Sequence, residues 1–417
     1  MVKEPQTPLF DLIMCLSDAV DLVSPALVNH HKQVAYIACN IGAELGLPLE
    51  QQSDLVLAGA LHDIGALSLK ERMEMLQFEI DKPHKHAELG YMLLKMFAPF
   101  SSTAPLVRFH HVPWSEGCGS EFQGKPVPLG GHILHLADRV AVLVDRRQEV
   151  LGQVERICER IEEQSGKRFR PELVEAFLSL AAKEYFWLDV VSPTIDSILA
   201  RRIRLTILEL DIKGLLSLAR VFSHIIDFRS PFTATHSSGV AASAESLARL
   251  VGFSARECLT MRIAGYLHDL GKLAVPKEIL EKPAKLTAEE FNVIRSHTFY
   301  TYRILERVPD LEVISTWAAF HHERLDGKGY PFHLRGEDMS LGSRIMAVAD
   351  VFTAITEDRP YRKGMPSERA LKVLQQMADD SALDLYLVAV LRSHYEEVNS
   401  ARMSAQAVAS KEYEEVK

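Results

Sequence analysis

The chain has 417 residues, which is enough for two or three domains of ordinary size. Hydrophobic residues make up 47% and charged residues 25% of the sequence, a globular composition that excludes a disordered or collagen-like chain. Because 56 Asp and Glu residues outnumber 47 Lys and Arg residues, giving a formal net charge of −9, the overall charge does not favour binding to DNA, RNA or an anionic membrane.

The cysteines and the N-terminal segment indicate the cellular compartment. The five scattered cysteines form no Cys-x-x-Cys pair, which argues against a zinc ribbon or a disulfide framework and fits a reducing compartment. Asp11, Asp18 and Asp21 interrupt the first apolar run, which is therefore not typical of a signal peptide. No uncharged apolar stretch reaches the length of about 18 residues that a membrane span needs. We therefore expect a cytoplasmic protein without membrane contact.

Helical patterns dominate the chain, and the alternation typical of strands is almost absent. The dense apolar pattern of residues 201–227 predicts a long buried helix, either a core helix of the second half of the chain or a rigid connector or dimer helix. The polar stretch from about Val398 to Lys417 is expected to fray. An apolar stripe predicts a further helix, at Val240, Ala244, Leu247 and Val251.

Two helix starts carry a recognisable cap. Ser254 with Glu257, and Thr287 with Glu290, have the spacing of a capping box, in which the first side chain and the fourth satisfy each other's backbone N–H groups. The helix that follows Ser254 is expected to stop at Gly271, and the one that follows Thr287 to run through residues 289–305.

Four short segments of the first half reappear in the same order in the second half. LVNHHKQVAYIA is similar to FTATHSSGVAASA, AGALHDIGALSL to AGYLHDLGKLAV, RFHHVPW to AFHHERL, and LGGHILHLADRV to LGSRIMAVADVF. His30 lies 32 residues before His62, and His236 lies 32 residues before His268. This pattern predicts two copies of one helical domain. We expect an all-α protein with tandem domains at residues 1–200 and 201–400, joined by a long helix, and a polar tail at 401–417.

The second copy carries an ordered set of His and Asp residues. Imidazole nitrogens and carboxylate oxygens suit first-row divalent metals, and the set offers more donors than one ion needs. An adjacent His-Asp pair allows the carboxylate to bridge two ions, which at about 3.5–4 Å separation can clamp a phosphodiester and share a hydroxide. The candidate ligands are His236, His268, Asp269, His297, His321, His322 and Asp350.

This order of ligands, together with HDLGK, HHERLDGKGYP and VADVFTAITEDRPYR, resembles the HD-GYP subfamily of the HD superfamily of metal-dependent phosphohydrolases over roughly residues 205–395. The resemblance implies a phosphodiesterase that opens a bacterial cyclic dinucleotide to the linear dinucleotide, with cyclic di-GMP as the first candidate substrate and 3′,3′-cyclic GMP-AMP as the second. It implies two divalent ions, of Fe, Mn or Ni, or of Zn or Co, that hold the attacking hydroxide. Asp269 would bridge them.

The same resemblance assigns residues to the substrate. Lys272 would contact the scissile phosphate and assist the leaving oxygen, so that Lys272 and Asp269 are the candidate catalytic residues. Arg359 and Arg362 would hold phosphate, with a surface ion pair as the alternative. Tyr330 would line the pocket or would only shape its loop, in which Gly327 and Gly329 permit tight turns.

Two positions depart from the family pattern. Some members place a Glu four residues before the first His and hold a third metal, whereas this chain has Phe232 there, so we expect two ions. The family often has an Asp three residues after the last ligand, whereas this chain has Thr353, which leaves the support of Asp350 open.

The first copy is expected to be degenerate. Ala66 stands where the second copy has Lys272, and neither a GYP loop nor an RPYR segment follows. We therefore expect this domain to be structural or regulatory, forming a homodimer or binding a signalling protein; whether it also binds metal is left open. Its candidate ligands are His30, His62, Asp63, His86, His110, His111 and Asp138.

Two other functions remain in view. The protein could be a non-catalytic cyclic-dinucleotide receptor or signalling scaffold, against which the complete ligand set with Lys272 speaks. It could also be a general nucleotide phosphohydrolase of the wider HD group, against which the GYP loop speaks.

Overall fold

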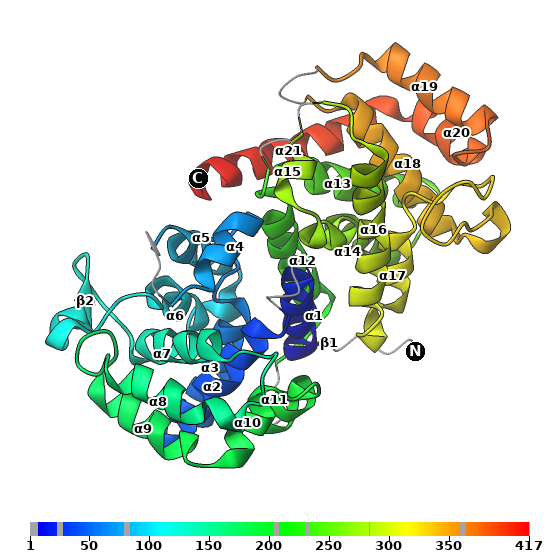
Figure 1. The fold of residues 1–417 in the computed structure, drawn as a ribbon. Coiled ribbons are helices and arrows are strands. Elements are labelled where there is room, and N and C mark those ends of the chain that lie inside the picture. Colours follow the sequence, from blue (N-terminus) through cyan, green and yellow to red (C-terminus); the bar gives the residue numbers. More distant parts are fainter. Residues whose placement is uncertain are drawn as a thin grey trace. The chain divides into compact units, whose positions relative to one another are not determined.

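The computed structural model describes residues 7–22, 28–78, 84–203, 208–230, 233–282, 284–358 and 363–416. The chain divides into an N-terminal unit, Pro8–Glu209, and a second unit made mainly of Leu210–Lys417. The described residues are mostly helical, with four two-residue strands (Figure 1), so the predicted all-α class is confirmed. The strands are β1 (Thr7–Pro8), β2 (Glu121–Phe122), β3 (Lys125–Pro126) and β4 (Glu209–Leu210).

The N-terminal unit is built around α2, whose residues from Val34 to Cys39 are fully buried. Helices α3 and α7 pack on α2. Gly59 allows the close approach of α3, because a Cβ atom there would lie 2.5 Å from the Ala35 Cα. The helices are α1 (Leu9–Asp21), α2 (His30–Glu44), α3 (Leu49–Leu61), α4 (Leu69–Met75), α5 (His84–Leu94), α6 (Thr103–Phe109), α7 (Leu129–Leu143), α8 (Val154–Glu162), α9 (Pro171–Ala181), α10 (Glu184–Val190) and α11 (Ile195–Ile203), with short 3₁₀ turns at Ala98–Phe100, Ser115–Ser120 and Leu151–Gln153.

The second unit repeats this plan around α13, against which α14, α18 and α21 pack. Gly265 plays the part of Gly59, since its Cβ would lie 2.5 Å from the Ala241 Cα. The sequence repeat therefore corresponds to a repeated arrangement of helices around the central helix of each unit. The helices are α12 (Ile212–Asp227), α13 (His236–Leu250), α14 (Ala255–Leu267), α15 (Lys277–Leu280), α16 (Ala288–Leu305), α17 (Glu312–Ala319), α18 (Leu341–Thr356), α19 (Ser367–Asp379), α20 (Leu385–Ser393) and α21 (Tyr395–Val416), with 3₁₀ turns at Leu270–Ala274, Pro309–Leu311 and Gly336–Asp338.

Both predicted capping boxes are present, at the starts of α14 and α16. The stop predicted at Gly271 is wrong: α14 ends at Leu267, and Gly271 lies in the 3₁₀ turn that follows. Glycine is needed at that position for another reason, because a Cβ atom would lie 1.9 Å from the His297 carbonyl oxygen of α16.

The prediction of one long helix over residues 201–227 is wrong. Helix α11 ends at Ile203, β4 occupies Glu209–Leu210, and α12 begins only at Ile212. Asp211 starts α12, because its carboxylate accepts a hydrogen bond from the Gly214 N–H at 2.7 Å. Since α12 belongs to the second unit and buries its apolar face there, the core-helix alternative is the one that the structure supports.

The fraying expected from about Val398 is also wrong, because the described residues from Val398 to Val416 belong to α21, which begins at Tyr395. Val398 and Ala409 bury one side of this helix. Its polar end is tied down as well, since the Glu412 carboxylate pairs with Arg220 and lies 3.3 Å from His224 Nε2. Sequence composition hid this helix because its few buried positions are widely spaced.

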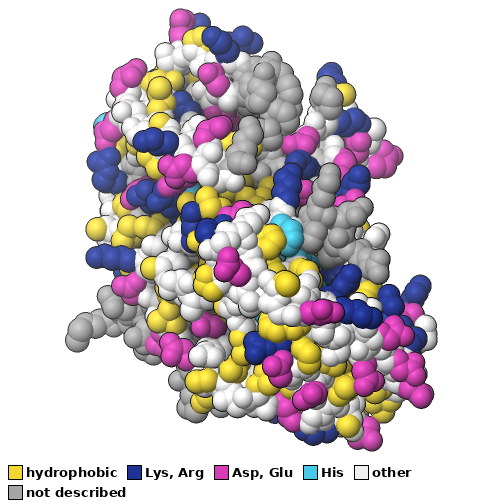
Figure 2. All heavy atoms as spheres, turned by 90° about the vertical axis from the view of Figure 1, so that its left-hand side faces the viewer, with side chains coloured by type: hydrophobic (Ala, Val, Ile, Leu, Met, Phe, Trp, Pro, Cys, Tyr) yellow, Lys and Arg dark blue, Asp and Glu magenta, His cyan; other side chains and the backbone are white. Residues whose placement is uncertain are grey.

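The predictions about cysteines and membranes concern residues that the structure describes. None of the five cysteines, all of which lie in the described ranges, forms a disulfide. Among the described helices, none has the combination of length and apolar character that a membrane span requires. On the face drawn in Figure 2, Lys and Arg side chains are interspersed with Asp and Glu side chains, and little histidine is visible.

Candidate metal centre

The second unit gathers all seven predicted ligands from five helices. His236 opens α13, His268 and Asp269 follow the end of α14, His297 lies in α16, His321 and His322 follow α17, and Asp350 lies in α18. Their donor atoms form three overlapping groups, each within 4.8 Å: His236 with His268 and Asp350; His268 with Asp269 and His321; and His297 with His321 and His322.

Backbone hydrogen bonds fix the orientation of three of the histidines. The Nδ1 atoms of His268, His297 and His321 lie 2.8, 2.6 and 2.6 Å from the carbonyl oxygens three residues earlier. Because a carbonyl only accepts, each Nδ1 donates and each Nε2 presents a lone pair. The Nε2 atoms of His297 and His321 nevertheless face each other at 3.2 Å. A cation bound between the two lone pairs would remove their repulsion.

The two carboxylates complete a strongly polar, buried site. Asp269 Oδ1 is buried and accepts no hydrogen bond, which is consistent with a carboxylate oxygen that ligates a metal ion. Asp269 Oδ2 lies 2.6 Å from Lys272 Nζ and 3.2 Å from His268 Nε2. Burial alone would raise the pKa of Asp269, but His268 and Lys272 hold it well below its usual range. The pKa of Asp350 is also lowered against burial, through its hydrogen bond with His236. Both groups are therefore ionised at neutral pH, and the residues fit a pair of divalent ions.

Lys272 lies at the edge of this cluster. Its side chain is 19% exposed, and its ammonium group lies 2.6 Å from Asp269 Oδ2. Burial lowers the pKa of Lys272, but the neighbouring Asp269 more than offsets burial, and the pKa is raised. The site thus keeps a fixed positive charge where an anion can approach.

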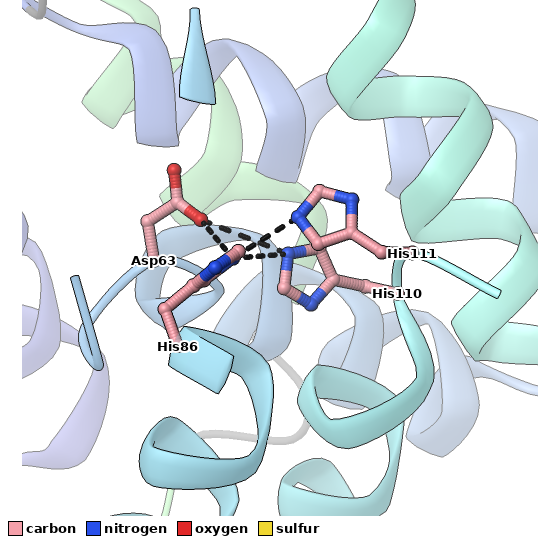
Figure 3. Close-up of side chains that lie close together, drawn as sticks. All are labelled: Asp63, His86, His110 and His111. Carbon is pink, nitrogen blue, oxygen red and sulfur yellow. Dashed lines mark hydrogen bonds and ion pairs between the residues drawn. The ribbon is translucent and has the colours of Figure 1, made fainter. Parts of the chain in front are cut away.

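The first unit assembles a second cluster from the corresponding places. Asp63, His86, His110 and His111 point toward one another (Figure 3), and His30, His62 and Asp63 form an overlapping group. His62 and His110 also turn Nδ1 to the carbonyl three residues earlier, at 2.8 and 2.6 Å. Four buried atoms that could bind a metal make no hydrogen bond to the described residues: His30 Nε2, His62 Nε2, Asp63 Oδ1 and Asp138 Oδ1. The geometry therefore fits a metal in this unit as well.

Comparison with known proteins identifies the family of the chain. Residues 27–143 and 220–387 each match a family model described as an HD domain. The 3′3′-cGAMP-specific phosphodiesterase 1 of Vibrio cholerae is 31% identical over 383 residues, which span 89% of this chain and 88% of that protein. The chain belongs to the HD-GYP family of phosphodiesterases.

Further relatives match parts of the chain or its fold. A cyclic di-GMP phosphodiesterase of Pseudomonas aeruginosa is 42% identical over 142 residues, 34% of each chain. The crystal structure of a cyclic GMP-AMP-specific phosphodiesterase of V. cholerae superposes with a TM-score of 0.63 over 94% of this chain and 98% of that chain, at 23% identity. At this identity the superposition shows a shared fold.

The HD-GYP loop lies beside the cluster of the second unit. The Tyr330 ring centroid is 5.0 Å from that of His322, and the Arg295 guanidinium lies 5.0 Å above the Tyr330 ring. The Glu323 carboxylate shapes the loop by accepting N–H groups of Phe332 and Leu334 at 2.6 and 3.0 Å. The Tyr330 ring therefore lies next to a predicted ligand, His322.

Sequence reasoning missed three residues of this HD-GYP unit: Glu323, Arg295 and Glu357. Both Glu357 oxygens lie 3.1 Å from His236 Nδ1, and Gln406 of α21 donates to Glu357 Oε2 at 3.1 Å. Burial lowers the pKa of His236, but Glu357 and Asp350 outweigh it and raise the pKa to about 10. Two of the three had a signal in the sequence, because Glu323 lies within HHERLDGKGYP and Glu357 lies within VADVFTAITEDRPYR, seven residues after Asp350.

The remaining predicted positions have different outcomes. The open question about Thr353 is answered in part, because Asp350 has His236 Nε2 at 3.2 Å, while the Thr353 hydroxyl lies 3.4 Å from that of Ser243. Gly327 has a positive φ of 75°, as a tight turn requires. Phe232, Arg359 and Arg362 lie outside the described residues.

Proposed function

We propose that the second unit hydrolyses a 3′,3′-linked cyclic dinucleotide to the linear dinucleotide. The observation that carries the proposal is the seven-residue His/Asp cluster with Lys272 beside it, whose Nζ lies 2.6 Å from Asp269 and whose side chain is 19% exposed. A buried cluster without such a cation could hold metal, but it would lack a donor for a phosphoryl oxygen.

The ligands divide naturally between two ions. His236, His268 and Asp350 would hold one ion, and His297, His321 and His322 the other. Asp269 would bridge them, because its Oδ2 faces His268 and its Oδ1 lies 3.4 Å from His297. When bound, divalent Fe, Mn or Ni, or else Zn or Co, supplies positive charge to the phosphoryl oxygens and lowers the pKa of water.

The side chains around the ions would position the substrate. Lys272 would donate to a phosphoryl or leaving oxygen, where a fixed ammonium stabilises the charge that develops during bond cleavage. Arg359 and Arg362 would hold the second phosphate. Tyr330, with Arg295 above its ring and Phe291 6.5 Å away, would line the pocket.

We rank the candidate substrates by how much of this chain each named relative matches. The sequence pattern alone places cyclic di-GMP first. We place 3′,3′-cyclic GMP-AMP first, because the relative named for it matches across both units, whereas the P. aeruginosa cyclic di-GMP enzyme matches about a third of the chain.

The test is a chromatographic turnover assay of the full chain with Mn²⁺ or Fe²⁺ under anaerobic conditions. Cyclic di-GMP, cyclic di-AMP and 3′,3′-cyclic GMP-AMP are offered separately, beside a panel of mononucleotides. We expect linear product from 3′,3′-cyclic GMP-AMP, and more slowly from cyclic di-GMP. Binding without cleavage under every metal would favour the receptor function, and cleavage of mononucleotides alone would favour a general phosphohydrolase.

A further inference from the structure

Four buried side chains of the first unit converge on one point (Figure 3). Asp63, His86, His110 and His111 each offer one atom, and these atoms lie within 4.8 Å of one another. We call them the four-donor group. Asp63 follows α3, His86 lies in α5, and His110 and His111 follow α6. Gly65 brings the first two elements together, because a Cβ atom there would lie 2.1 Å from the His86 carbonyl oxygen.

The spacing of the four atoms is that of a tetrahedron. His86 Nε2 lies 3.2 Å from Asp63 Oδ1 and 3.4 Å from His110 Nε2. His111 Nε2 is 3.0 Å from His86 Nε2, and Asp63 Oδ1 is 3.6 Å from His110 Nε2. Around a Zn²⁺ ion with bonds of about 2.0–2.1 Å, the ligands of a regular tetrahedron lie about 3.3 Å apart. One ion therefore fits at the centre of the group with little movement of its ligands.

Hydrogen bonds within the group do not account for this convergence. His110 Nδ1 lies 2.6 Å from the Val107 carbonyl oxygen and donates to it, so His110 Nε2 carries a lone pair. Asp63 Oδ1 is buried and accepts no hydrogen bond from the described residues. The nitrogen that faces both acceptors is His86 Nε2, which carries at most one hydrogen and cannot serve both. A cation at the centre binds all of them.

The corresponding group of the second unit is more open. Among the described residues, the group within 4.8 Å there contains three histidines, His297, His321 and His322. The side chain of His322 is 31% exposed, whereas its counterpart His111 is buried. Structural zinc sites fill four positions with protein ligands, while catalytic sites leave one position to water or substrate. The first unit thus has the ligand set of a structural site.

A positive charge already lies at the other end of the first cluster. Asp138 Oδ1 lies 3.4 Å from His30 Nε2 and 3.8 Å from His62 Nε2, while Asp138 Oδ2 lies 2.6 Å from the buried Arg139 guanidinium. The four-donor group contains no such cation. We therefore place the ion in the four-donor group.

We propose that Asp63, His86, His110 and His111 bind one Zn²⁺ ion in tetrahedral geometry, and that this ion has a structural role in the first unit. The ion joins the residues that follow α3 and α6 to the first turn of α5. Zn²⁺ suits three imidazoles and a carboxylate, and its filled d shell allows four-coordination without penalty. The site is separate from the catalytic cluster of the second unit.

The first test compares the zinc content of His86→Gln and His84→Gln in the full chain after Zn²⁺ loading and gel filtration. His84 is the matched control, because it lies two residues away in α5, where its ring contacts Phe122 at 4.6 Å between centroids. We expect His86→Gln to hold one zinc per chain less than His84→Gln. Equal zinc content in the two variants would overturn the site.

The structural role is tested by thermal unfolding of the same two variants. A ligand that binds only the native state raises its stability. We therefore expect Zn²⁺ to raise the melting temperature of chelator-treated His84→Gln by more than that of chelator-treated His86→Gln. Equal shifts would contradict a structural ion at this site.

A third test uses the unaltered protein, so it does not depend on the folding of a variant. Co²⁺ in a tetrahedral site absorbs visible light far more strongly than six-coordinate Co²⁺, because a tetrahedron has no centre of symmetry. We expect strong visible bands from the Co²⁺-loaded unaltered protein and from His268→Ala, and weak bands from His86→Gln. Weak bands from the unaltered protein would overturn the tetrahedral site, and bands lost in His268→Ala but kept in His86→Gln would place it in the second unit.

Discussion

The two clusters share a frame and differ in where their positive charge lies. In each unit, a histidine at the start of the central helix lies 5.4 Å, between ring centroids, from the histidine that ends the next helix. In the second unit Lys272 pairs with the Asp269 carboxylate, whereas in the first unit Arg139 pairs with Asp138 at 2.6 Å and Ala66 replaces the lysine. His322 has 31% of its side chain exposed, while its counterpart His111 is buried. The two units thus share the frame that brings the predicted ligands together, and they differ in the position of the positive charge and in solvent access.

The turn after each His-Asp pair shows that the first unit has kept its scaffold. Arg229 donates to the Lys272 carbonyl at 2.6 Å, and Arg72 donates to the equivalent Ala66 carbonyl at 2.8 Å. The two arginines come from different places in the chain, one before its central helix and one after the turn. The backbone geometry is thus maintained in the first unit although the side chain that would act on substrate is absent.

The largest difference is expected from removing the His-Asp pair in each unit. His268→Ala with Asp269→Ala should lower kcat at least about a thousandfold and release metal, because both ions lose ligands. His62→Ala with Asp63→Ala is the matched control and should leave kcat near that of the unaltered protein. Turnover, metal content and circular dichroism are measured for both. A comparable loss in a folded first-unit variant would mean that the first cluster is coupled to catalysis.

Lys272→Met should lower kcat by about 10²–10³-fold with metal content unchanged, because one donor to the developing charge is removed. The control is Lys277→Met. Lys277 is the first residue of α15 and its Nζ lies 3.7 Å from the Glu281 carboxylate, so its replacement should have little effect on kcat. Steady-state kinetics and metal analysis provide the measurement. A rise in KM at constant kcat would instead assign Lys272 to ground-state binding.

Glu357→Gln should weaken metal retention or activity by about 10–100-fold, because a charged partner of a ligating histidine is lost. The equivalent position in the first unit is Asp145, which bonds to Arg147 and Gln148. Asp145→Asn should therefore leave metal content unchanged. Competition with a chelator, followed by metal analysis, compares the two variants, and equal metal loss would contradict the support assigned to Glu357.

The smallest effect concerns stability and pH. Burial raises the pKa of Asp227 to about 7, even though His236 opposes the shift. In the unfolded chain its pKa is about 3.9, so between about pH 4 and pH 7 the native state binds the extra proton, and this group's contribution to the unfolding free energy falls as pH rises. Asp227→Asn keeps an acceptor for the Ser237 N–H and lacks this penalty. Its stability advantage in metal-free protein should grow from pH 4 to pH 7 in urea titrations. A constant difference would show that Asp227 does not titrate in this range.

The clustering of the predicted ligands could be foreseen from sequence, because a repeated order of His and Asp indicates which helix ends must meet. The caps at Ser254 and Thr287 were equally local, since their hydrogen bonds span three residues. Glu357 and Gln406 could not be found in this way: their bonds connect residues 121 and 49 positions apart, and no local pattern records them. The break before α12 was missed because the apolar pattern of 201–227 outweighed the single cap at Asp211.

Helix α21 contributes a contact to the second cluster from near the end of the chain, so this contact forms late in synthesis. The described residues of the first cluster all lie before Glu209, where the first unit ends, so they are all present in the chain once that unit has been synthesised. The second cluster waits much longer, because the hydrogen bond that steadies Glu357, and through it His236, comes from Gln406. The residues of the first cluster are therefore all synthesised well before those of the second. A truncation just before Gln406 would keep all seven predicted ligands in the chain and remove the hydrogen bond to Glu357, which lies beside His236.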